Sequence, residues 1–277
     1  MVFASLKGES STAPSSGESP EAGALQRGLL LLDLMVNSGR ALTLTELAEQ
    51  SNLHVSTVHR LMQTLTQTEH VFRDSAKRYY AGPRAYLPLS LYHPFNVLRR
   101  DSYETLRSLR DRFGVTCGLS IFIGTQRLLV ELAPASNSLS PYYQTHLTSP
   151  LHAAASGKLL LLNFPARQWH ELLGPPPYQQ YTPHTITEAE AVERELELTA
   201  ERGYAVSLNE NFKGISAVGA PINVTPTRAV GAITFAGPSA HFTADSVPEM
   251  GTAARQAADL LALGSPGVRA VRQQLGF

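Results

Sequence analysis

Two short helical patterns that meet almost without a loop constrain this chain most. The stretch LTLTELAEQSNLHVSTVHRLMQTL, residues 42–65, contains both patterns. Thr43 with Glu46 three residues later is a capping box, in which each side chain accepts a hydrogen bond from the other residue's backbone amide. Because this box marks a helix start at Leu44, we expect a first helix that ends near Asn52, a residue type that tolerates a left-handed backbone.

The spacing in this stretch is typical of a DNA-binding helix-turn-helix. Ala48 is small where a second helix must cross closely, Asn52 follows four residues later, and the branched Val58 follows ten residues after Ala48. One face of the second helix is left over and carries polar side chains that can bind phosphates and base edges. The alternative is an ordinary helical hairpin with a solvated face. The candidate DNA-binding residues on this helix are Ser56, Thr57, Arg60, Gln63 and Thr64.

A basic hairpin pattern follows the second helix. The segment HVFRDSAKRYYAG, residues 70–82, alternates, turns at DSA and alternates again. Arg73, Lys77 and Arg78 lie at the tip of the predicted hairpin, which we interpret as a wing that contacts the DNA backbone beside the groove. Residues 24–84 hold seven Lys or Arg against five Asp or Glu. Since this positive balance is weak, we expect tight binding to need two subunits.

The remainder of the chain mixes strand and helix patterns. Strand patterns occur at TCGLSIFIG, RLLVELA, ISAVGAPINV and AVGAITFAG, with helical patterns at 153–162, 187–202 and 244–263. Such a mixture predicts an α+β fold. The expected organisation is a disordered tail, a DNA-binding domain, a linker, an α+β domain and a loosely attached tail, at residues 1–23, 24–84, 85–97, 98–263 and 264–277.

Composition and missing motifs argue against several classes of protein. No apolar run approaches the roughly 20 residues that span a bilayer, so no membrane partner is expected. The single cysteine, Cys117, excludes an internal disulfide and suits a reducing cytoplasm. The histidines lack ligand spacing, so we expect no metal and no cofactor. SGKL at 156–159 lacks the flanking residues of a phosphate-binding loop, and no Gly-x-Ser-x-Gly elbow occurs. We therefore assign no catalytic residue and disfavour an enzyme.

The chain resembles the IclR type of transcriptional regulator from about Ala24 to Leu263. The matching segments, in the family's order, are ALQRGLLLLDLM, LTELAEQSNLHVSTVHRLMQTL, RYYAGPRAYLPL, PLHAAASGKLLL, RGYAVSLNENFKGISAVGAPI and AVGAITFAGP. The resemblance implies a winged helix-turn-helix, a linker helix and a C-terminal GAF-like α+β domain that binds a small molecule. It also implies a bacterial protein that binds palindromic double-stranded promoter DNA as dimers, often as dimers of dimers.

The resemblance further implies an effector site in the C-terminal domain. The acidic residues and the cysteine that the family often has there are absent, so no matched side chain carries a charge. Hydroxyl groups in an apolar cleft, with any free amides at a helix start, indicate a small organic effector, either a carboxylate or a compact apolar molecule. Alternatively, these small residues serve only close packing, and the C-terminal domain oligomerises without a ligand. The matched positions are Ala155, Ser156, Ser207, Ile215, Ala217, Thr234 and Ala236.

Four residues depart from the family pattern in the first half of the chain. His54 takes the N-cap position of the second helix, where Ser or Pro is usual, and histidine is a weak cap. Val55 stands where a basic residue often touches phosphate. Pro88 and Pro94 interrupt a linker that is usually one helix, so a long straight linker helix is not expected.

Overall fold

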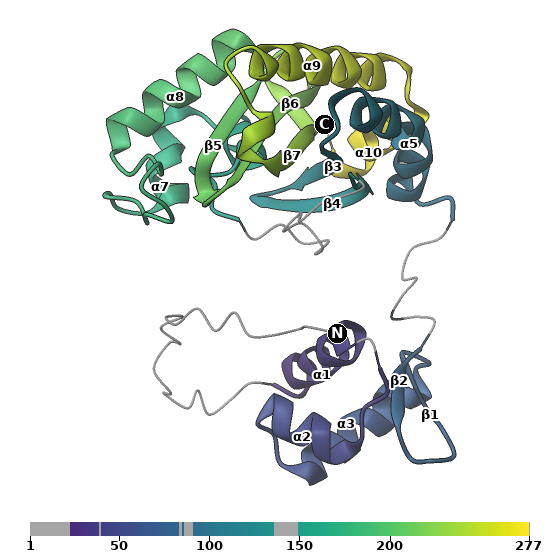
Figure 1. The fold of residues 1–277 in the computed structure, drawn as a ribbon. Helices are drawn as coiled ribbons and strands as arrows, with labels where there is room; N and C mark the ends of the chain where they lie inside the picture. Colours follow the sequence, from purple (N-terminus) through teal and green to yellow (C-terminus); the bar gives the residue numbers. More distant parts are fainter. Residues whose placement is uncertain (1–22, 39, 83–84, 86–90, 136–148, 277) are drawn as a thin grey trace. The chain divides into compact units, whose positions relative to one another are not determined.

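The chain divides between residues 89 and 90 into two compact units, which are considered separately (Figure 1). The computed structural model describes residues 23–38, 40–82, 85, 91–135 and 149–276. The predicted tail at 1–23, except for Gly23, and residues 86–90 of the predicted linker, which include Pro88, lie outside these residues.

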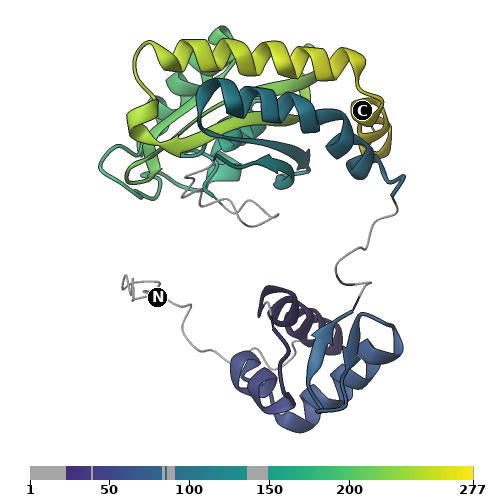
Figure 2. The ribbon, with the colours of Figure 1, turned by 45° about the vertical axis from the view of Figure 1, so that its right-hand side comes forward.

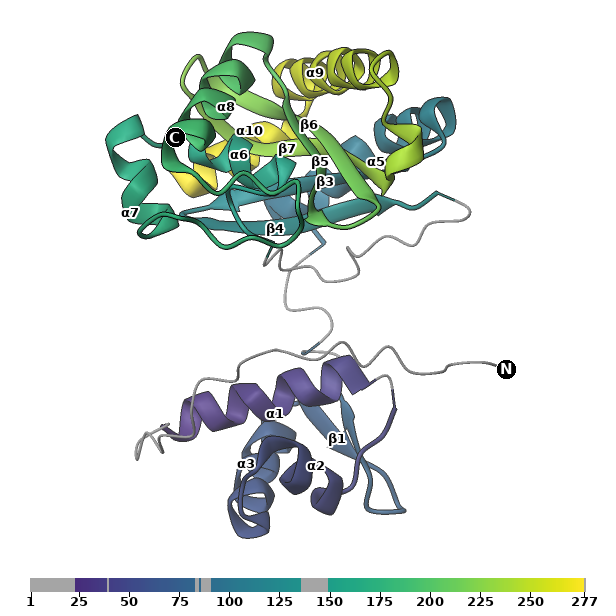
Figure 3. The same cartoon turned by 60° about the vertical axis from the view of Figure 1, so that its left-hand side comes forward.

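Among its described residues, the first unit has three helices, α1 to α3, followed by a two-stranded antiparallel hairpin (Figure 3). Asn52 adopts the left-handed conformation, with φ 54° and ψ 34°, as predicted for the turn between the second and third helices. Leu31, Leu47, Val58 and Met62 are buried together and join the three helices in one core. The elements are α1 (Ala24–Ser38), α2 (Leu44–Ser51), α3 (Val55–Gln67), β1 (Val71–Arg73) and β2 (Tyr79–Ala81).

In its described part, the second unit is an α+β domain built on a five-stranded antiparallel sheet with the strand order β4-β3-β7-β6-β5. Its strands are β3 (Thr116–Ile123), β4 (Gln126–Ala133), β5 (Ala205–Phe212), β6 (Ile215–Thr225) and β7 (Arg228–Pro238). Its α-helices are α5 (Pro94–Phe113), α6 (Ala155–Leu161), α7 (Trp169–Leu173), α8 (Ala189–Arg202), α9 (Ser246–Gly264) and α10 (Pro266–Leu275).

The helices lie in two layers, one on each face of this sheet. On one face α5, α9 and α10 pack over apolar residues of the strands, and Figure 2 shows α5 and α9 side by side there. On the other face α6 covers a patch of small residues that includes Ala217, Ala232 and Ala236. Because side chains alternate along each strand, the two faces present separate apolar sets. The face under α6 is the one that carries the cavity described below.

The C-terminal residues correct one prediction, because they are not a loosely attached tail. Val268 and Val271 of α10 are buried in the main core, where α10 packs against α5. Asp101 of α5 accepts hydrogen bonds from the hydroxyl of Ser265, at 2.6 Å, and from the amide of Gly267, at 2.8 Å. Gly267 lies so close to the backbone of Leu98 that a Cβ there would collide with it. The apolar residues of this segment therefore belong to a helix that packs against the domain.

Pro94 is the first residue of α5 rather than an interruption within it. The imidazole of His93 accepts a hydrogen bond from the amide of Phe95, at 3.3 Å, and so caps the helix start. Proline suits the first helical position because its missing N–H would have no partner within the helix. Among the described residues, none of the helices is both apolar and long enough to traverse a membrane.

Candidate DNA-binding surface and effector pocket

The outer face of α3 exposes most of the predicted DNA-binding residues. Ser56, Arg60, Gln63 and Thr64 are exposed and Thr57 is half-buried. The opposite face is held in the core by Val58, Leu61 and Met62. The structure therefore brings the predicted polar residues together on one side of the helix that follows the tight turn.

The start of α3 lacks a side-chain cap, as the sequence predicted for His54. The imidazole Nδ1 of His54 instead lies 2.9 Å from the hydroxyl of Ser56. Two further exposed residues on this surface were not predicted to contact DNA: Val55, which is 47% exposed, and His59. Val55 is the first residue of α3 and His59 lies one turn later, so helical spacing could have placed both on this surface.

The predicted wing is the β1–β2 hairpin, and its three basic residues have different surroundings. The guanidinium of Arg78 forms an ion pair with Asp74 at 3.0 Å, and the amide of Arg78 donates to the same carboxylate at 2.8 Å. The hydrogen bond from the Arg78 amide, aided by the Arg78 guanidinium, holds the pKa of Asp74 below its usual range. Arg73 lies over the ring of Tyr79, 5.4 Å from its centroid. Within the described part of the chain, Lys77 makes no ion pair or side-chain hydrogen bond.

An aromatic pair on the hairpin escaped the sequence analysis. Phe72 and Tyr80 are cross-strand partners whose rings stack with centroids 4.9 Å apart. Phe72 is 50% exposed, so the wing presents an apolar surface next to its charges. Strand alternation puts both rings on the side away from the core, since Val71 and Ala81 point inward. That alternation was visible in the sequence and would have revealed the pair.

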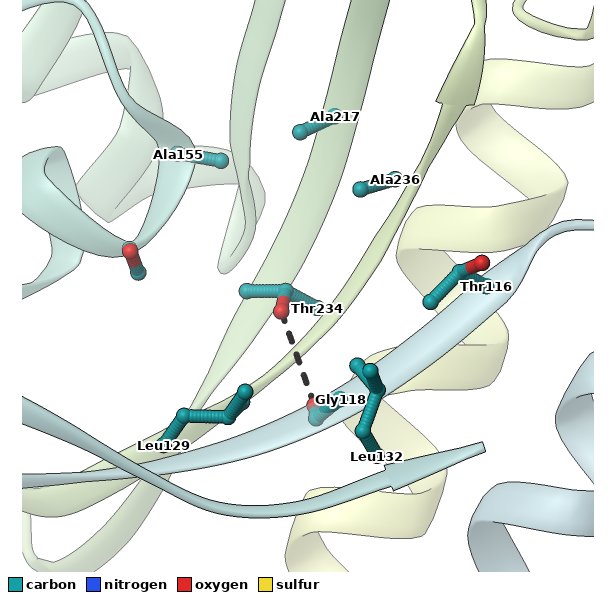
Figure 4. A pocket seen from close by; sticks show the side chains of 9 residues that line it. Thr116, Gly118, Leu129, Leu132, Ala155, Ala217, Thr234 and Ala236 are labelled. Carbon is teal, nitrogen blue, oxygen red and sulfur yellow. Dashed lines mark hydrogen bonds between the residues drawn. The ribbon is translucent and has the colours of Figure 1, made fainter. Parts of the chain in front are cut away.

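A narrow pocket lies in the second unit, on the face of the sheet that α6 covers (Figure 4). The centres of water-sized molecules can occupy about 20 Å³ of it, within about 380 Å³ of atom-free space that includes the open mouth. The first volume is close to that of a single water position, so a larger ligand requires side chains to move apart. The lining residues are Thr116, Gly118, Leu129, Leu132, Ala155, Ser156, Ala217, Thr234 and Ala236.

Five of the seven positions implied by the family resemblance line this pocket, and two do not. Ser207 is buried, and its hydroxyl donates to the carbonyl of Ala153 at 2.7 Å, which ties β5 to the turn before α6. Ile215 is the first residue of β6 and pairs with Phe212 and Pro238 at that end of the sheet. Neither Ser207 nor Ile215 is therefore part of the pocket lining.

Strands β3 and β4 supply the lining residues that the sequence analysis missed. Gly118 lies beside Thr234 in the sheet, and the Thr234 hydroxyl faces the Gly118 carbonyl at 3.5 Å (Figure 4). A Cβ at Gly118 would meet the side chains of Leu129 and Leu132 at 3.3 Å each, so the glycine leaves room for both leucines. No local signal could have identified these residues, because only the strand order brings β3 next to β7.

Few polar groups face this pocket. The Thr234 bond is long for an O–H···O contact, so this hydroxyl is only weakly engaged. The hydroxyl of Ser156 accepts a hydrogen bond from Nη1 of Arg127 at 2.9 Å. At the start of α6 the amide of Gly157 is not free for a ligand, because it donates to the carbonyl of Ala154 at 2.9 Å. The available groups suit a small ligand held by few hydrogen bonds.

Lys158, in the SGKL segment, forms a buried ion pair. Its ammonium lies 2.8 Å from the carboxylate of Glu210 and donates to the carbonyl of Val206 at 2.7 Å, which links α6 to β5. Burial raises the pKa of Glu210, and the neighbouring Lys158 opposes that rise. Within the part of the chain that the structure describes, no group of three or more His, Cys, Asp or Glu is placed to hold a metal ion.

Comparisons with known proteins agree with both units. A family model described as "Bacterial transcriptional regulator IclR C-terminal" matches residues 95–262, and one described as "IclR helix-turn-helix domain" matches residues 24–75. The "Probable transcriptional regulator SauR" of Cupriavidus necator is 31% identical over 237 residues, which cover 82% of this chain and 92% of that protein.

Solved structures show the same fold. The crystal structure of the Thermotoga maritima IclR is 26% identical, covers 91% of this chain and 98% of its own, and has a TM-score of 0.69. An IclR homolog from Microbacterium hydrocarbonoxydans, complexed with 4-hydroxybenzoate, is 21% identical and has a TM-score of 0.73. The match covers 90% of this chain and 100% of that chain. Because one family model spans most of the second unit and another spans the helix-turn-helix, the chain belongs to the IclR family of bacterial transcriptional regulators.

Proposed function

We propose that this regulator binds palindromic promoter DNA through α3 and the β1–β2 wing, and that a small organic effector in the pocket beneath α6 controls that binding. The protein acts in the bacterial cytoplasm, and its role is regulatory rather than enzymatic. The observation that carries the proposal is the pocket itself, where an apolar lining meets a few hydroxyl groups. The Microbacterium hydrocarbonoxydans homolog, which is complexed with 4-hydroxybenzoate, supports a small organic effector, and side chains around the pocket must move apart to admit a molecule of that size.

The DNA-binding half of the proposal rests on α3 and the wing. Arg60 and Gln63 are exposed on the face of α3 opposite the core, and side chains of these types recognise bases in the major groove. Lys77 at the hairpin tip supplies a phosphate contact. The first unit of a single chain offers few positive charges, so we infer that two copies of the protein act together on the two halves of a palindrome.

Exposed apolar surface on α1 supports self-association. Leu25 and Leu29, one turn apart, are 77% and 54% exposed. Large apolar side chains grouped on one face of a surface helix favour contact with a second protein surface. We infer a dimer, or a dimer of dimers, as the form that binds DNA.

Selection from random double-stranded DNA with the full chain tests the DNA half of this proposal. We expect the recovered sequences to share a palindrome and the affinity to fall steeply with salt. Repeating the binding measurement with aromatic and aliphatic carboxylates then tests the effector half. If every bound ligand leaves DNA affinity unchanged, the second unit serves oligomerisation alone.

A further inference from the structure

Arg127 places a buried cation directly behind the lining of the pocket. Its side chain is only 2% exposed, although arginine is rarely buried without specific partners. Nη1 donates to the hydroxyl oxygen of Ser156 at 2.9 Å, and Nη2 donates to the carbonyl of Ser149. Arg127 therefore joins β4 to the segment that leads into α6, and one of its hydrogen bonds ends on a residue of the pocket wall.

The direction of the Arg127–Ser156 bond determines what Ser156 can offer a ligand. A guanidinium has five N–H donors and no acceptor, so the oxygen of Ser156 must be the acceptor in this bond. The hydroxyl hydrogen of Ser156 then points elsewhere. In the described part of the chain this hydroxyl donates to no acceptor. Since Ser156 lines the pocket, a ligand group at this end can accept that hydrogen.

The charge of Arg127 adds a preference for a negative acceptor. None of the nine described residues that line the pocket is ionisable, and Leu129, Leu132 and Ala236 make this part of the wall largely apolar. In such surroundings the effective dielectric constant is low, so a cation one hydrogen bond away interacts strongly with a ligand's charge. A hydrogen bond that polarises a hydroxyl also strengthens the next bond that this hydroxyl donates.

We propose that Arg127, acting through Ser156, makes this pocket select effectors that carry a carboxylate. The carboxylate accepts a hydrogen bond from the Ser156 hydroxyl, and the apolar remainder of the effector packs against Leu129, Leu132 and Ala236. Arg127 is thus a positioning and specificity-determining residue. This inference rests on the proposed effector function and adds to it the residue that sets the ligand's charge.

Matched pairs of acids and amides test the role of Arg127. The probes are benzoate with benzamide and 4-hydroxybenzoate with 4-hydroxybenzamide, titrated calorimetrically into the full chain. The wild-type protein should bind at least one acid more tightly than its amide. Arg127→Gln and Ser156→Ala should each reduce that preference on the order of tenfold, or about 1.4 kcal/mol. Arg127→Lys, which keeps the charge, should retain part of the preference.

The ratio of acid to amide affinity separates this role from a purely structural one. A variant that merely distorts the pocket weakens both members of a pair, whereas loss of the charge weakens the acid alone. A melting temperature for each variant establishes that it is folded. Equal affinity of acid and amide in the wild type, or binding of neither acid, overturns the inference about Arg127.

A pocket-filling variant tests the site separately from the charge. Ala236→Leu should block acids and amides alike, because the added carbons occupy the space of the ligand's body. If the acids bind Ala236→Leu with wild-type affinity, the proposed effector pocket itself is wrong. If Ala236→Leu blocks binding but Arg127→Gln keeps the full acid preference, the pocket stands and the role given to Arg127 fails.

Discussion

Thr43 and Glu46 cap the start of α2 reciprocally. The amide and the hydroxyl of Thr43 both donate to Oε2 of Glu46, at 2.8 and 2.9 Å, and the amide of Glu46 donates to the Thr43 hydroxyl at 3.3 Å. The hydrogen bond from the Thr43 amide is the main cause, and the contact with Arg40 the second, that lowers the pKa of Glu46 from 4.5 to about 2. The capping box predicted from the sequence is therefore confirmed, and it has a consequence for stability at low pH.

Glu46→Gln should reveal this consequence. Because the pKa of Glu46 is lowered in the folded state, its ionised form stabilises α2 above pH 4.5, and that contribution is lost as the pH falls towards about 2. The variant should melt at a lower temperature than the wild type at neutral pH, and the gap should close near pH 2. Thermal unfolding followed by circular dichroism measures the gap.

Glu49→Gln is the matched control for that experiment, because it removes the same charge from the exposed side of α2. Its difference from the wild type should change little over the same pH range. A gap for Glu46→Gln that stays constant down to pH 2 would show that the capping box is not what titrates.

Arg60→Ala should lower affinity for the selected palindrome by about 1–3 kcal/mol, the value of one good base contact. Affinity for unrelated DNA should fall much less, since Arg60 is proposed to read a base. Fluorescence anisotropy with both DNA fragments gives the ratio of the two affinities. Arg27→Ala removes the same charge from α1, outside the recognition helix, and should leave that ratio unchanged. An unaltered ratio for Arg60→Ala would remove this residue from the recognition surface.

Two charged residues of the wing, Lys77 and Asp74, should respond to neutral substitutions in opposite directions. Lys77→Ser should weaken binding to all DNA sequences and reduce the slope of log K against log[salt] by about 1. Asp74→Asn retains an oxygen that can accept the Arg78 amide but loses the charge that holds the Arg78 guanidinium. The released guanidinium should strengthen binding and steepen the slope by a similar amount. Slopes equal to the wild type in both variants would place the hairpin away from DNA.

The sequence predicted what local interactions decide. The capping box, the left-handed turn at Asn52 and the β1–β2 hairpin each depend on residues within a few positions of one another. The α+β class of the second unit followed from the periods of its segments. By contrast, the docking of α10 depends on Asp101, more than 160 residues earlier in the chain, which no local pattern reveals.

The residues of the pocket could likewise be predicted from the sequence only in part. Ala155, Ser156, Ala217, Thr234 and Ala236 could be named because they stand in matched segments. Ser207 stands in such a segment too, but its hydroxyl is used to hold the turn before α6. The lining from β3 and β4, and the buried Arg127 behind Ser156, depend on strand order and on a hydrogen bond across 29 residues. These features had to come from the fold.

Ala236→Leu should produce a regulator that binds DNA and ignores its effector. Ala236 is 4% exposed and lines the pocket from β7, so leucine adds carbons to space that the ligand needs. Overpacking there costs about 1–3 kcal/mol where the wall is tight. DNA binding without ligand should persist, because α3 and the wing belong to the other unit. An effector shifts DNA affinity only through its own differential binding, so a blocked pocket removes the response.

Ser207→Ala is the control that separates the ligand site from its support. It removes the buried bond to the Ala153 carbonyl and should lower the free energy of unfolding by about 1–3 kcal/mol. Since Ser207 does not line the pocket, effector affinity in the folded protein should stay close to that of the wild type. Calorimetry and DNA-binding titrations on both variants give the comparison. If Ser207→Ala abolishes effector binding while Ala236→Leu preserves it, the ligand lies on the β5 side of α6 and not in the pocket described here.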